Sequence, residues 1–136
     1  MWGNLADAYS QVQDLQAKAP EAFKHAVELA TRELEVNSKD STARSSLAYY
    51  LMRLGDKRRA LEEIKQAGTS APDDPDVLFW TALVYELAGN REKALNALAS
   101  AAAGGYSLAV IRAASDLDEL RKDTRYQDLV EHSGPH

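Results

Sequence analysis

The sequence contains no cysteine among its 136 residues, and only four prolines. The missing cysteine excludes disulfide frameworks, thiolate zinc sites and cysteine nucleophiles. No apolar run approaches the roughly 18 residues that a membrane-spanning helix needs. The first residues also lack a basic stretch followed by an apolar one, so we expect neither membrane insertion nor export by a signal of its own. The compartment is left open, with the cytoplasm favoured.

The sequence also has fewer basic than acidic residues. The chain carries 16 basic and 21 acidic residues, which gives a net charge of −5 and an isoelectric point near 5.2. This is the wrong sign for a protein that binds the phosphate backbone, so we predict no nucleic-acid partner. The short basic run Lys57-Arg58-Arg59 is followed one turn later by Glu62 and Glu63. We interpret it as a solvated, partly paired helix face.

Helix-forming residues are abundant. The sequence holds 23 Ala and 17 Leu, and 45% of its residues are hydrophobic against 27% charged. Ala and Leu favour helices, and this balance is enough to bury a core. The composition therefore predicts an all-α fold.

An internal repeat divides the chain. The stretch 54–67 matches 88–101 position by position, with Gly, Ala and Leu identical at several places. Each copy predicts two helices joined by a tight turn. Gly55 and Gly89 supply the left-handed conformation that ends the first helix, and Asp56 and Asn90 follow as N-caps of the second. Close helix packing is predicted at small or aliphatic positions, namely Ala60, Ile64, Ala67, Ala94, Leu98 and Ala101.

The sequence upstream resembles the tetratricopeptide repeat (TPR) family, and the stretch 116–129 resembles the tail that closes many bacterial arrays of this family. Trp2, Leu5, Ala6 and Tyr9 match the first helix of that repeat, and its small-large-small second helix is matched by Ala19, Phe23 and Ala26. The resemblance covers about residues 2–103. It implies an α-solenoid of antiparallel helix pairs within a single domain over 1–132. The expected parts are repeat one (1–38), repeat two (41–72), repeat three (75–103), a C-terminal cap (106–132) and a tail (133–136).

One spacing departs from the repeat. Ala26 and Ala67 lie seven positions further apart than Gly55 and Gly89 do. Since seven residues make about two helical turns, we expect the second helix of repeat one, from Pro20 to about Val36, to be two turns longer than its counterparts and to project from the stack.

The C-terminal region reads as a cap. Gly104-Gly105 ends a helix, and Ser115 and Thr124 are predicted to be the N-caps of short helical pieces. The apolar residues expected to cover the end of repeat three are Leu117, Leu120, Tyr126, Leu129 and Val130. The N-terminal end has no such cap, so we expect this array to be part of a larger multidomain protein.

No pattern in the sequence indicates chemistry. The three histidines stand in no metal-ligand spacing, and the acidic pairs occur at helix starts or on exposed faces. We therefore predict no catalytic residue, cofactor or metal, and no enzymatic activity.

The resemblance implies instead that the first helices of the repeats line a concave groove for a partner peptide or helix. We expect Tyr49 and Phe79 to anchor this partner, with Arg53 and Glu86 orienting it. The residues predicted to face the groove are Ser45, Tyr49, Met52, Arg53, Phe79, Leu83, Glu86 and Leu87.

Two alternatives stay open. Neighbouring helices and the C-terminal segment could cover Phe79, Trp80, Leu83 and Leu87, since the helix over 76–88 is apolar nearly all round. The module could also be structural, packing on parent domains or forming a homodimer through its N-terminal end and long helix. The identity of the partner is not encoded in any motif that we recognise.

Overall fold

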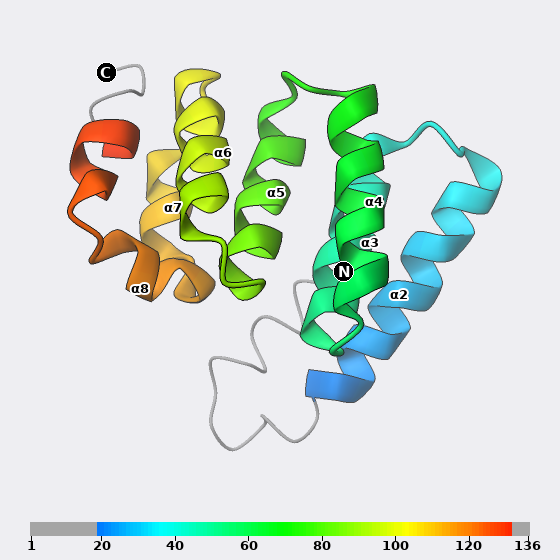
Figure 1. The fold of residues 1–136 in the computed structure, drawn as a ribbon. Coiled ribbons are helices and arrows are strands. Elements are labelled where there is room, and N and C mark those ends of the chain that lie inside the picture. Colours follow the sequence, from blue (N-terminus) through cyan, green and yellow to red (C-terminus); the bar gives the residue numbers. More distant parts are fainter. Residues whose placement is uncertain (1–18, 132–136) are drawn as a thin grey trace.

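The computed structural model describes residues 19–131 and is all-helical over that range, without strands, as predicted (Figure 1). Successive helices pack against one another in pairs. None of these helices is long and apolar enough to cross a bilayer. The first helix of repeat one, predicted around Trp2 and Tyr9, and the tail at 133–136 lie outside the described residues. The longer helices are α2 (Ala19–Val36), α3 (Ser41–Arg53), α4 (Lys57–Ser70), α5 (Pro75–Leu87) and α6 (Arg91–Ala103).

The repeat of the sequence is also a repeat of the structure. Helices α3 and α5 both have 13 residues, and their first residues are as far apart in sequence as Gly55 and Gly89. The same holds for the first residues of α4 and α6. The predicted N-caps are confirmed, because Asp56 accepts a hydrogen bond from the Arg59 amide and Asn90 accepts one from the Lys93 amide. A second pair of caps at the same offset, Asp40 and Asp74, starts α3 and α5.

The glycine turns also follow the prediction. Gly55 and Gly89 have φ values of 92° and 83°, in the left-handed region that favours glycine. In each turn the next amide donates back to a helix carbonyl, from Asp56 to Leu51 at 2.9 Å and from Asn90 to Tyr85 at 2.9 Å. These bonds satisfy carbonyl groups that the helix end would otherwise leave unpaired.

Small side chains allow the paired helices to approach closely. All four predicted alanines, which are Ala60, Ala67, Ala94 and Ala101, are fully buried. Ile64 and Leu98, one turn away from them, are buried as well. The predicted packing positions are therefore confirmed.

The bounds of α2 agree with the predicted Pro20 to Val36, but its excess length over the other second helices differs from the prediction. Helix α2 has 18 residues against 14 in α4, so it is longer by four residues, or about one turn, and not by two. Four residues separate each of these helices from the next one, which places Ala26 in register with Ala60. The prediction was wrong because Ala26 matches Ala60 and Ala67 equally well in sequence. In the additional turn, Pro20 and Glu21 are exposed, whereas Ala22 is buried.

The C-terminal segment is made of short helical pieces that fold back on the pairs. They are α7 (Leu108–Ala113), the 3₁₀ turn η2 (Ser115–Leu117), α8 (Asp118–Arg121) and the π-helical turn η3 (Gln127–Glu131). The turn η2 packs on α5, and η3 packs on α6. Of the predicted capping residues, Leu117, Leu120, Tyr126 and Val130 are buried, whereas Leu129 is 36% exposed.

The helix starts in this segment differ from the prediction. Ser107 caps α7 by accepting a hydrogen bond from the Val110 amide at 3.3 Å. Ser115 is the first residue of η2 and not its N-cap, because the extended residue Ala114 takes the capping position there. Next to the predicted cap Thr124, it is Asp123 that accepts a hydrogen bond, from the Arg125 amide two residues on.

Candidate functional site

We call the side of α3 and α5 that carries the eight predicted groove residues the inner face. Its residues are buried to different degrees. Ser45 and Tyr49 are fully buried, Leu83 is 4% exposed and Phe79 is 7% exposed. Met52, Arg53 and Glu86 are half-buried, and Leu87 is 38% exposed. The structure thus places the two predicted anchors, Tyr49 and Phe79, inside the core.

Aromatic rings form a continuous cluster across the inner face. The ring of Tyr49 lies 5.3 Å from that of Trp80 and 6.1 Å from that of Phe23. Phe79 stacks on Tyr106 of the C-terminal region at 4.5 Å, with the two planes 12° apart. Such pairs contribute about 0.5–1.5 kcal/mol beyond their burial. The cluster therefore links α2, α3 and α5 to Tyr106, which follows Gly104-Gly105 at the end of α6.

A polar triad lies against this cluster. Arg53 donates to Asp116 at 3.1 Å and to the Tyr49 hydroxyl at 2.9 Å. The Tyr49 hydroxyl donates to the other carboxylate oxygen of Asp116 at 2.5 Å. The Arg53 guanidinium also lies 4.7 Å from the centre of the Phe23 ring. Asp116 thus accepts two charge-assisted hydrogen bonds from α3, a helix far from it in the sequence.

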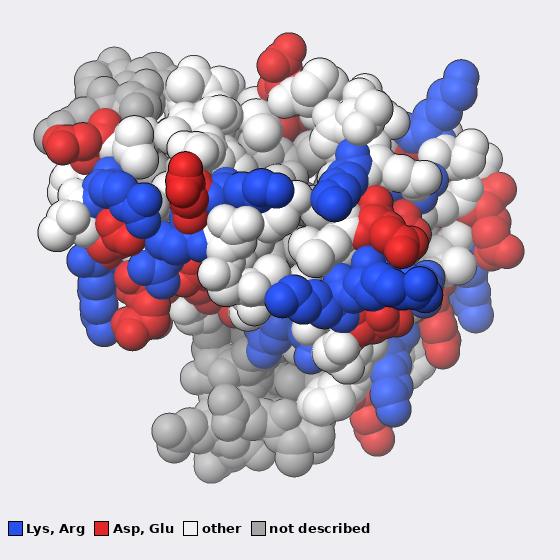
Figure 2. All heavy atoms as spheres, viewed as in Figure 1, with Lys and Arg blue, Asp and Glu red and all other residues white. Residues whose placement is uncertain are grey.

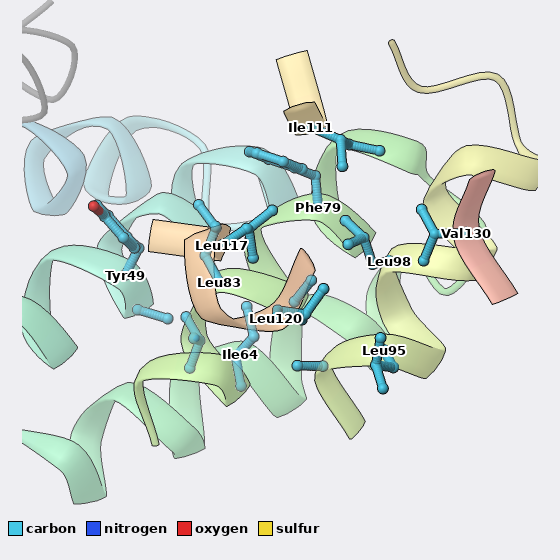
Figure 3. Packing of buried hydrophobic residues seen from close by; sticks show 14 of the residues in the cluster. Tyr49, Ile64, Phe79, Leu83, Leu95, Leu98, Ile111, Leu117, Leu120 and Val130 are labelled. Atoms are coloured by element: carbon cyan, nitrogen blue, oxygen red, sulfur yellow. The ribbon is translucent and has the colours of Figure 1, made fainter. Parts of the chain in front are cut away.

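The residue after Asp116 completes the contact. Leu117 is fully buried and belongs to the same hydrophobic cluster as Leu83 of α5 (Figure 3). Leu120, one turn later, is fully buried in that cluster too. Residues 115–121 therefore cover part of the inner face, because Asp116 is bound to α3 and η2 packs on α5.

A second polar group ties the C-terminal segment to the array. Arg91 donates to both carboxylate oxygens of Glu86, each at 2.7 Å, and reaches Asp123 at 3.5 Å. Arg125 donates to Asp123 as well, and these bonds hold the pKa of Asp123 well below its ordinary value. Glu86, which we expected to orient a ligand, is thus bound to Arg91, and Arg53 is bound to Asp116.

The remaining surface offers few other candidates. Basic and acidic side chains are intermixed over the face shown in Figure 2. A hollow of about 400 Å³ lies beside Tyr106, between the start of α5 and the start of α7. Burial, and to a lesser extent the charge of Asp76, raises the pKa of Tyr106 to about 12. Within residues 19–131 no group of three His, Asp or Glu side chains could hold a metal ion.

Nothing in the sequence indicated Asp116 as part of this site. It stands in a charged stretch with Asp118 and Glu119 as neighbours, and nothing in its spacing relates it to α3. The only available signal was indirect, because a tyrosine and an arginine one turn apart on a packed helix require polar partners. No protein family, curated protein or solved structure matches this chain.

Proposed function

We propose that this chain is a protein-interaction scaffold, a tetratricopeptide-like α-solenoid whose inner face binds a short segment of a partner protein. One observation carries the proposal. The inner face already holds a short helical segment, residues 115–121, through the contacts of Asp116 with Tyr49 and Arg53 and through the burial of Leu117. A surface that accommodates its own helix in this way has the shape and chemistry to bind another.

The repeated architecture supports the same function. Helix starts, caps, glycine turns and buried alanines recur at one constant offset, which equals the repeat length typical of tetratricopeptide repeats. Stacked helix pairs of this kind present extended faces that serve as binding surfaces. The repeated helix pairs support the role of a scaffold. The contacts on the inner face support this face as the place where the partner binds.

The composition of the inner face is also that of a recognition surface. Tyr, Trp and Arg dominate the energetics of protein interfaces, because they bury a large area and keep a polar end for hydrogen bonding. Here Tyr49, Trp80 and Arg53 lie next to one another. The charged groups at this face, Arg53 and Glu86, form ion pairs with Asp116 and Arg91. Side chains that already bind charged groups of this chain are suited to bind those of a partner.

A peptide-library selection on the full chain tests this function. We expect it to yield peptides that cross-link to α3 or α5, and to lose binding to the variant Arg53→Glu. The matched control is Arg58→Glu, which makes the same charge change at an exposed position on α4. A selection that yields no peptides, or only peptides that cross-link outside α3 and α5, would contradict the proposal.

A further inference from the structure

We infer that the partner of the inner face carries a short helix with the pattern Asp-Leu-x-x-Leu, and that residues 115–121 occupy its place until the partner replaces them. This inference rests on the proposed function and adds two things to it, the chemistry of the partner and the regulation of access. The pattern is that of Asp116, Leu117 and Leu120 in this chain.

Three contacts define what a partner has to reproduce. The carboxylate of Asp116 binds Arg53 and the Tyr49 hydroxyl at 3.1 and 2.5 Å. Leu117 and Leu120 are both fully buried in the main cluster. Leu117 enters this cluster from the end of η2, and Leu120 enters it from α8. A helix that offers one carboxylate directly before this apolar pair therefore fits the inner face.

The charge requirement is specific. Arg53 lies over the Phe23 ring and is about one-fifth exposed, so a partner that covers it without an acidic group would leave a guanidinium away from water and without its carboxylate. Such an arrangement is costly, and a basic group at this place would be repelled. The inner face should therefore discriminate against neutral and basic helices.

The segment over the inner face can leave without unfolding its neighbours. It consists of a 3₁₀ turn of three residues and an α-helical turn of four, both too short to be stable without packing. On one side α7 keeps its own buried residue, Ile111. On the other side η3 packs on α6 through the buried residue Val130.

Release takes Leu117 and Leu120 out of the main hydrophobic cluster and breaks several polar contacts. Besides the bonds of Asp116, Arg121 donates to the carbonyl groups of Ile111 and Ala114, at 2.7 and 2.8 Å. All these groups are part-buried, so water can replace the lost partners once the segment moves. Local opening of such an edge segment is a common low-energy motion of folded domains.

Binding of the chain's own segment in trans tests the inference. The probe is a fluorescently labelled peptide of residues 107–131, titrated into the full chain and followed by anisotropy. Because a closed inner face reduces the apparent affinity by the fraction of open molecules, the variant Asp116→Lys should bind the peptide at least ten times more tightly than the wild type does. The control Asp73→Lys makes the same charge change at an exposed position between α4 and α5 and should bind as the wild type does.

A charge reversal tests the role of Arg53. The full-length variant Arg53→Glu should prefer a peptide carrying Asp116→Lys over the unchanged peptide by at least tenfold, whereas the variant Asp116→Lys should show the opposite preference. Circular dichroism checks that each variant is folded, and Asp116→Asn replaces Asp116→Lys if the latter is not.

Several results would overturn the inference. One is equal affinity of the peptide for the wild type and for the opened variant. Another is a preference that Arg53→Glu leaves unchanged. Dimers of the opened variant that the free peptide dissociates would assign the inner face to a second copy of the chain. In all three cases, library peptides that cross-link to α3 or α5 would still support the proposed function, so the two failures can be told apart.

Discussion

The Tyr49 hydroxyl donates a hydrogen bond of 2.5 Å to the Asp116 carboxylate and joins α3 to a segment 67 residues later in the chain. Arg53 lies beside both groups, so the carboxylate is held by a neutral and a charged donor. This contact closes the inner face, and its strength sets how easily the face opens.

Substitution of Tyr49 by phenylalanine tests the strength of this contact. The ring and its packing remain, but Asp116 loses one donor, so we expect the free energy of unfolding to fall by about 1.5 kcal/mol. Urea denaturation followed by circular dichroism measures the change. The matched control is Tyr85→Phe on α5, whose half-buried ring lies beside Lys93 and should tolerate the loss of its hydroxyl at a cost below about 0.5 kcal/mol. Equal effects of the two substitutions would contradict the assigned role of Tyr49.

Substitution of glycine by alanine should lower stability in the glycine turns and raise it in α4. Gly55 and Gly89 have positive φ, so Gly55→Ala and Gly89→Ala should each lower stability by about 1–2 kcal/mol. Gly68 lies inside α4, and a Cβ there would meet open space. Gly68→Ala should therefore raise stability by about 0.5–1 kcal/mol. Thermal unfolding of the three variants checks the signs, and destabilisation by Gly68→Ala would argue against the register of α4.

Enlargement of a buried alanine tests the close helix packing. Ala94 is fully buried between paired helices, so Ala94→Leu should lower the free energy of unfolding by about 1–3 kcal/mol through overpacking. Ala103, at the exposed end of α6, serves as the control. Ala103→Leu should change stability by less than about 0.5 kcal/mol. Comparable losses of stability at both positions in urea denaturation would show that close helix packing at Ala94 does not restrict the size of its side chain.

Alkaline pH should weaken the protein through Tyr106. Its pKa is raised from 10.0 to about 12, mainly by burial, so the folded state favours the neutral phenol. The resulting stability is present in full below pH 10 and is lost as the pH rises from 10 through 12. Tyr106→Phe keeps the stack on Phe79 and should make stability less dependent on pH in this window. Unfolding midpoints at pH 9, 10 and 11 test this, and an unchanged slope in the variant would rule out Tyr106 as the group responsible.

The repeated part of the fold could be predicted from the sequence because its signals are local. Gly55 and Asp56 determine a turn within four residues, and the same pair returns as Gly89 and Asn90. The buried alanines follow from helical spacing within each unit. The register of α2 could not be predicted in this way, because an alanine-rich helix offers several equivalent matches and only packing selects among them.

The sequence left open whether the C-terminal segment covers the inner face, and the contact that does so could not be predicted. The closure depends on a contact between Asp116 and α3, which are distant in the sequence, and on short helical pieces whose direction is set by tertiary packing. The eight groove positions were derived from one helix face at a time. Whether that face is open or covered depends on a segment with no periodic pattern of its own.

Hydrogen exchange of the full chain, with and without the peptide 107–131, tests most directly whether a partner helix replaces residues 115–121. If a partner helix replaces residues 115–121, the amides of Leu117 to Lys122 in the chain should exchange at least ten times faster when an unlabelled peptide is bound, while those of α3 and α5 remain protected. The variant Asp73→Lys, which changes an exposed residue between α4 and α5, should behave as the wild type does. Unchanged protection of Leu117 to Lys122 at saturating peptide would contradict the account, since it would mean that the inner face stays closed.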